Sequence, residues 1–115
     1  MTKFLYLFWN KQSGWAPQSP EQMEQRMKTW MTWMDGLAKK GTLVGGEPLQ
    51  NTGKQISGKK KVVTDGPFVE AKESVGGYLI VNAKDINDAV EISKSCPIFE
   101  FDGHVEVRPI QKMEM

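Results

Sequence analysis

The chain has 115 residues, with 15 Lys and Arg against 14 Asp and Glu, so its formal net charge at pH 7 is +1. This length suits a single domain, residues 1–115, with its own core, and the balanced charge gives no basic footprint for nucleic acid or an anionic membrane. No apolar run reaches the roughly 20 residues of a membrane-spanning helix, and no apolar leader precedes the first strand. The single cysteine, Cys96, excludes an internal disulfide. We therefore expect a soluble, cytoplasmic protein.

The first predicted elements are a strand and an amphipathic helix. Residues 4–9 (FLYLFW) are apolar at every position, which is typical of a central strand covered on both faces. Ser19 and Pro20 predict a helix start, and Gln22 can complete a capping box. Trp33 is expected either to line a cleft or subunit contact or to rest partly exposed on the neighbouring strand. The apolar residues that share a three-and-four spacing, and are predicted to form one buried stripe, are Met23, Met27, Trp30, Met31, Met34, Leu37 and Ala38.

The middle of the chain predicts a glycine-interrupted strand and then an exposed hairpin. Residues 42–49 contain Gly45 and Gly46, which is consistent with a bulge or an edge position. Residues 55–57 and 61–63 flank a short glycine- and lysine-rich turn and are expected to form a β-ribbon. Three lysines in a row at its tip indicate a solvated edge that blocks strand addition, with a phosphate-binding patch as the less favoured alternative.

The last third of the chain predicts a second central strand and a second helix. Residues 77–81 are again apolar on both faces, and Asp85, with Asp88 three positions later, is expected to cap the helix. This helix should end before Cys96, because Pro97 disfavours helical geometry in the residue that precedes it. Cys96 itself is expected to be a small buried residue, and a nucleophilic role is the less favoured alternative.

The order of the elements predicts the fold. It reads β-α-β, a β-hairpin insertion, then β-α-β, which is the α+β, ferredoxin-like plan with two helices on one face of an antiparallel sheet. The two strands that are apolar on both faces need a partner on the face that the helices leave open. We therefore expect sheet-to-sheet homodimerisation.

The closing strand, residues 104–110 (HVEVRPI), alternates strictly and provides the first candidate site. Alternation places His104, Glu106 and Arg108 on the open face of the sheet, inside the expected dimer. Arg108 is one of two arginines, and its guanidinium suits a bidentate carboxylate or phosphate contact; a structural ion pair with a neighbouring strand or subunit is the equal alternative. His104 is the single histidine, so no metal site is expected.

The tight turn at residues 65–67 (DGP) provides the second candidate site. Asp65 stands at a strand end beside a backbone fixed by glycine and proline, where its carboxylate could be partly desolvated and act as a general base. The alternative is that Asp65 caps its own turn. Glu70, Lys72 and Glu73 follow and form either a charge cluster around a polar ligand or an exposed, solubilising segment.

Residues 63–78 (VTDGPFVEAKESVGGY) resemble the DGPF signature of the YCII-related domain family, in which Asp-Gly-Pro-Phe, Glu-x-Lys-Glu and Gly-Gly-Tyr recur in this order. Further similar segments are residues 43–47 (LVGGE) and 105–109 (VEVRP). The resemblance implies a dimeric α+β barrel. A His-Asp pair is typical of the family, but residues 9–11 (WNK) stand where its histidine is expected, so that role is not transferred to His104.

Together these features predict a homodimer that binds a small polar or aromatic metabolite without a cofactor and uses Asp65 for proton transfer. Relatives by fold include cofactor-independent isomerases, dehalogenases and monooxygenases. The alternative is a non-enzymatic regulatory or interaction module, because DGPF-type domains are sometimes joined to sigma-70-like factors. Such a module would act through a protein or a ligand, since the sequence shows neither a helix-turn-helix nor a basic face for direct DNA binding.

Overall fold

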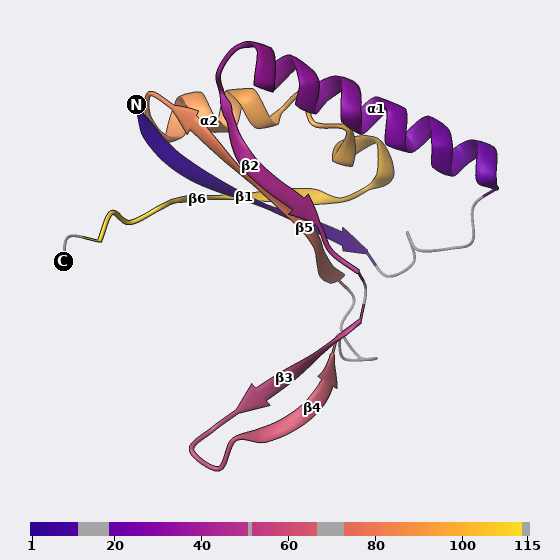
Figure 1. Cartoon of the computed structure of the whole chain (residues 1–115), viewed down its shortest axis with the longest axis vertical. Coiled ribbons are helices and arrows are strands. Elements are labelled where there is room, and N and C mark those ends of the chain that lie inside the picture. The colour runs from indigo at the N-terminus through magenta and orange to yellow at the C-terminus, as the bar shows by residue number, and fades with distance from the viewer. Residues whose placement is uncertain (12–18, 51, 67–72, 114–115) are drawn as a thin grey trace.

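The computed structural model of the chain describes residues 1–11, 19–50, 52–66 and 73–113. Four strands form one antiparallel sheet in the order β2-β5-β1-β6, and both helices lie on one side of it (Figure 1). The sheet strands are β1 (Thr2–Lys11), β2 (Leu43–Pro48), β5 (Glu73–Ala83) and β6 (His104–Pro109). The helices are α1 (Pro20–Lys39), α2 (Ile86–Ser93) and the short 3-10 helix η2 (Pro97–Phe101). The predicted α+β, ferredoxin-like fold is confirmed.

A separate hairpin stands apart from this sheet. Its strands, β3 (Gly53–Ser57) and β4 (Val62–Gly66), pair only with each other. Figure 1 shows the helices above the four-stranded sheet and the hairpin extending below it. The predicted β-ribbon is confirmed, although β4 begins one residue later than expected because Lys61 adopts a left-handed turn conformation with φ of 56°.

The helix boundaries follow the predicted caps. The Ser19 hydroxyl accepts from the Gln22 backbone N–H at 3.2 Å, and the Gln22 side chain accepts from the Ser19 N–H at 3.1 Å, which completes the capping box. At α2, the Asp85 carboxylate accepts from the Asp88 N–H at 2.8 Å. Among the described residues, neither α1 nor α2 is long and apolar enough to cross a membrane.

The hydrophobic core lies between the sheet and the helices. Alternate residues of β1 and β5 point into it, because successive side chains of a strand face opposite sides. The Tyr6 hydroxyl donates to the Ala89 carbonyl of α2, and burial raises the pKa of Tyr6. Phe8 contacts the rings of Trp30 and Trp33 edge-on, with centroids 5.1 and 6.4 Å apart. The core residues from these two strands are Phe4, Tyr6, Phe8, Leu79, Val81 and Ala83.

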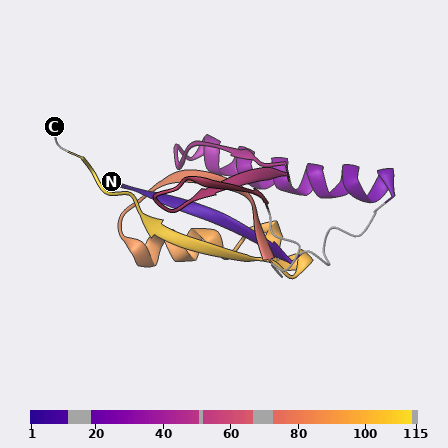
Figure 2. The same ribbon diagram turned by 90° about the horizontal axis from the view of Figure 1, so that it is seen from below.

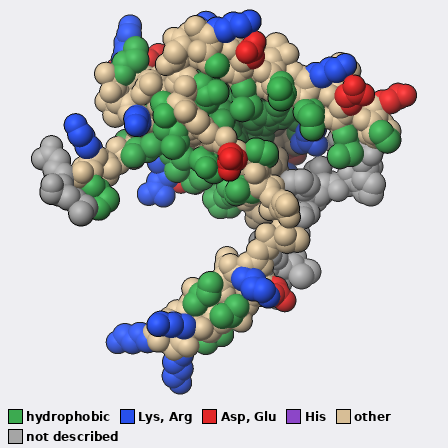
Figure 3. Space-filling view, viewed as in Figure 1, with side chains coloured by type: hydrophobic (Ala, Val, Ile, Leu, Met, Phe, Trp, Pro, Cys, Tyr) green, Lys and Arg blue, Asp and Glu red, His purple; other side chains and the backbone are tan. Residues whose placement is uncertain are grey.

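The predicted buried stripe of α1 is wrong at four of its seven positions, because three methionines in its first half and Ala38 near its end are exposed. Met23, Met27 and Met31 are 60%, 66% and 63% exposed, because the side of the helix that carries Trp30, Trp33 and Leu37 is the one that packs on the core. Figure 3 shows hydrophobic side chains gathered below α1. Trp33 rests on the core, as the second alternative foresaw. Its indole donates to the Ser95 hydroxyl at 2.8 Å, and its ring also lines a shallow groove.

Candidate functional site

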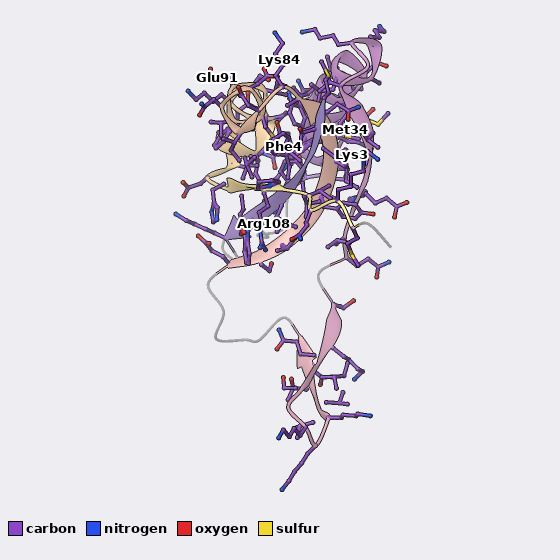
Figure 4. All side chains as sticks on the ribbon, turned by 90° about the vertical axis from the view of Figure 1, so that its left-hand side faces the viewer. Lys3, Phe4, Met34, Lys84, Glu91 and Arg108 are labelled. Carbon is purple, nitrogen blue, oxygen red and sulfur yellow. The ribbon has the colours of Figure 1, made fainter. Side chains whose placement is uncertain are left out.

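The open face of the sheet is the side turned away from the helices, and it carries the first candidate site. Strand pairing places Leu5 beside Arg108 and Leu7 beside Glu106 on this face. Val105 and Val107 pack against the core instead, so the predicted alternation of β6 is confirmed. Figure 2 views the molecule from this side, and Figure 4 shows Arg108 on the side of the sheet from which the hairpin projects.

An aromatic stack forms at one end of the open face. The rings of Trp9 and His104, which are register partners on β1 and β6, lie nearly parallel at 8° with centroids 5.9 Å apart. The Trp9 indole donates to Glu106 Oε1 at 3.1 Å. His104 Nδ1 lies 3.6 Å from Glu73 Oε2, a distance within ion-pair range but longer than a hydrogen bond. We call Trp9, Glu73, His104 and Glu106 the Trp9 cluster.

A bulge in β5 brings Glu73 to this cluster. Phe8 pairs with Gly77 and Trp9 pairs with Val75, so β5 holds one more residue than β1 at this point. The extra residue reverses the faces of the rest of the strand, and Glu73 then pairs with Lys11 on the open face. Without the bulge, the Glu73 carboxylate would point to the helix side.

The charged residues around the cluster are loosely paired. Arg108 Nε lies 3.8 Å from Glu106 Oε2, and the two side chains are 66% and 42% exposed, so the pair adds little to stability. The Arg108 guanidinium therefore stays accessible to an anion. Lys11 donates to Asp102 at 2.8 Å, and this hydrogen bond, together with the charge of that carboxylate, raises the pKa of Lys11.

Asp65 lies apart from these residues, on β4 of the hairpin. Its carboxylate pairs with Lys54 Nζ across the hairpin at 2.7 Å, and its side chain is 89% exposed. The partly desolvated position expected from the sequence is therefore absent in the single chain. The described partner of the Asp65 carboxylate is thus an ammonium group and not a backbone N–H of the turn. Asp65 lines only a shallow hollow, together with Thr52, Gly53 and Lys54.

The structure thus brings together some of the predicted site residues and adds a new one. Glu73, His104, Glu106 and Arg108 share the open face, whereas Glu70 and Lys72 lie outside the described residues. Sequence reasoning missed Trp9 as a site residue. Alternation along β1 places Trp9 on the same face as Leu5 and Leu7, which is the open face, so a signal for it was present in the sequence. Across the described ranges, no three His, Cys, Asp or Glu side chains gather closely enough to hold a metal ion.

Cys96 is buried in the core, at 4% exposure, and burial raises the pKa of its thiol to about 12. A thiol reagent attacks the thiolate, which is scarce and inaccessible here. We predict that Ellman's reagent at pH 8 modifies the native protein at least roughly 100-fold more slowly than the protein unfolded in urea, on the basis of this thiolate shortage. Equal rates in the two states would show that Cys96 is accessible.

The ferredoxin-like fold and a polar, aromatic cluster on the open sheet face define the class of this protein as a small α+β domain. The chain belongs to the YCII-related domain family, whose sequence profile matches residues 4–114. A search of curated proteins gave no match. Among solved structures, the chain is similar to a 5-chloro-2-hydroxyhydroquinone dehydrochlorinase from Burkholderia phenoliruptrix in complex with 2,5-dihydroxybenzoquinone, with 15% identity, 93% of each chain covered and a TM-score of 0.45.

Proposed function

We propose that this chain, as a DGPF-type member of its family, forms a homodimer that binds a small polar or aromatic metabolite at the Trp9 cluster. The observation that best supports this is the near-parallel stack of Trp9 and His104, in which each ring has a carboxylate at its side, Glu106 at Trp9 and Glu73 at His104. A flat ligand can extend such a stack, because aromatic rings favour offset packing. An acid group on the ligand can pair with the Arg108 guanidinium on the same face.

The chemistry that suits this arrangement is proton transfer without a cofactor. An imidazole or a carboxylate can hold a proton next to a bound ligand, and His104 Nδ1 lies 3.6 Å from Glu73 Oε2. Asp65 is the further candidate for the acid–base carboxylate. On its own chain Asp65 sits on the hairpin, paired with Lys54, so its part in the reaction depends on how the hairpin is placed in the assembly.

The test is thermal denaturation in the presence of phenols, hydroxybenzoates and phosphorylated small acids. A compound at about 100 times its dissociation constant should raise the free energy of unfolding by roughly 2.7 kcal/mol. We expect at least one aromatic acid to stabilise the wild type and to lose most of this effect with His104→Gln and Glu73→Gln.

The matched control is Glu91→Gln, which removes an exposed glutamate of α2 that pairs only with Lys94 among the described residues. This variant should respond to the ligand as the wild type does. If all variants were stabilised equally, the site would lie elsewhere on the molecule. If no compound stabilised the wild type, the regulatory or interaction module would become the better proposal.

A further inference from the structure

The β3–β4 hairpin has one face that combines apolar and charged residues. Cross-strand pairing places Ile56 opposite Val63 and Lys54 opposite Asp65, all four on the same face. Ile56 and Val63 are 63% and 56% exposed, so an apolar pair adjoins the Asp65–Lys54 ion pair in open solvent. A surface that covered Ile56 and Val63 would also take Asp65 out of water.

A hairpin of this kind needs a covering surface. An isolated two-stranded hairpin is marginally stable in water and usually requires packing against another element. Every residue of β3 is exposed, and its described strand partner is β4 alone. The hairpin extends below the sheet, toward the side of the open face (Figures 1 and 4). A molecule that covers the open face would therefore lie next to the hairpin.

The area of the open face suggests which molecule covers the open face and the hairpin. With strands of 6 to 11 residues, the face covers about 500 Å² at strand spacings near 4.8 Å and rises near 3.3 Å per residue. A stable interface buries about 800 Å² per partner. One face of the five-residue hairpin strands adds about 150 Å² by the same measure. The hairpin received from the other copy covers part of the open face that is already counted, so each copy contributes about 650 Å², which lies near the lower end of the range for stable interfaces.

The charges of the hairpin and of the open face also permit this contact. Lys54, Asp65 and the tip lysines 59–61 give the hairpin a formal charge of +3, so the remainder of a chain with a total of +1 carries −2. On the open face, the two carboxylates of Glu73 and Glu106 are balanced by the cations of Lys11 and Arg108. The net charge of this face therefore does not repel the basic hairpin of another copy.

We infer that the hairpin is an arm that packs its Ile56–Val63 face against a second copy of this chain, seated on the open face, and brings Asp65 to the Trp9 cluster of that copy. The inference rests on the proposed homodimer and extends it: each site is completed by a carboxylate from the other chain. Asp65 would then occupy the partly desolvated position that its own chain does not provide.

The first test measures the dimer dissociation constant by sedimentation velocity of the full chain. Ile56→Asp and Val63→Asp should each raise this constant at least tenfold, because a charge is placed in the contact. The matched control is Val62→Asp, since Val62 has the same size, is 55% exposed and lies on the opposite face of the hairpin; its constant should stay within twofold of the wild type. Equal effects of Val62→Asp and Val63→Asp would overturn the arm while leaving the dimer, and a monomeric wild type would overturn both.

The second test locates Asp65 without any ligand. An Asp65→Cys chain carrying a nitroxide label at this exposed position is mixed with ¹⁵N-labelled wild-type chain, in which Cys96 is buried. In mixed dimers we expect the Trp9 indole resonance to lose at least half of its intensity, while the resonance of Trp33, on the helix side, is retained. The inference would be overturned if the Trp9 indole resonance had the same intensity with the oxidised and the reduced label. It would also be overturned if the intensity fell only when the label and ¹⁵N were on the same chain. Neither result depends on whether the site binds a metabolite.

Discussion

Gly46→Ala is expected to lower the free energy of unfolding by about 2–4 kcal/mol, as overpacking and a strained backbone add up. A Cβ at this position would lie 2.3 Å from the Tyr78 carbonyl oxygen and 2.7 Å from Leu79 Cα, both backbone atoms that cannot move aside independently. Gly46 also has φ of 152°, which side-chain-bearing residues rarely adopt. Urea unfolding followed by tryptophan fluorescence measures the loss.

The neighbouring glycine supplies the control. A Cβ at Gly45 would meet nothing within 4 Å, so Gly45→Ala should change the free energy of unfolding by less than about 1 kcal/mol, the range of exposed substitutions. If both variants lost the same amount, the close approach of β2 to β5 at Gly46 would not be the cause.

Phe8→Ala should have the other large effect, a loss of about 3–5 kcal/mol, since it removes a buried aromatic ring and leaves a cavity. Phe8 is 5% exposed, and its ring contacts Tyr6 below α2 and both Trp30 and Trp33 of α1. Such a loss is a large part of the roughly 5–15 kcal/mol by which a domain is stable. The ring thus links the sheet to α1.

The control for Phe8 is the same substitution at Phe99, whose side chain is 48% exposed on η2. Phe99→Ala should cost less than about 1 kcal/mol, as for other surface changes. Trp9 follows Phe8 on β1 and points to the opposite face. We therefore also expect any aromatic acid found in the ligand screen to stabilise the Phe8→Ala variant less than it stabilises the wild type. A destabilised variant with unchanged ligand affinity would show that the Trp9 cluster does not depend on this part of the core.

Local features of the fold could be predicted from the sequence because their causes are local. The caps of Ser19 and Asp85 involve contacts three residues apart, and each was found as expected. The alternation of β6 also needed no knowledge of the rest of the chain, since successive strand side chains face opposite sides. Residues 104–108 were therefore assigned to the correct faces.

The remaining features depend on contacts between distant segments. The spacing of Met23, Met27 and Met31 indicates an amphipathic helix, but spacing alone does not show how the helix is rotated on the core. Glu73 reaches His104 because of a bulge in the β1–β5 register, and no local signal fixed that register. Turn chemistry predicted a bend near Asp65, yet it could not show that the hairpin stands away from the sheet.

The two outer strands of the sheet are poorly suited to pair with the sheet edge of another copy. β2 is irregular between Leu43 and Gly45 and ends at Pro48, and β6 ends at Pro109. Proline has no N–H to offer an incoming strand, and irregular edges pair poorly. These features disfavour edge-to-edge strand pairing between copies, which would extend the sheet without limit and lead toward fibres. The proposed association through the open face would end instead at a closed pair, so we expect a concentrated solution of this protein to stay free of aggregates.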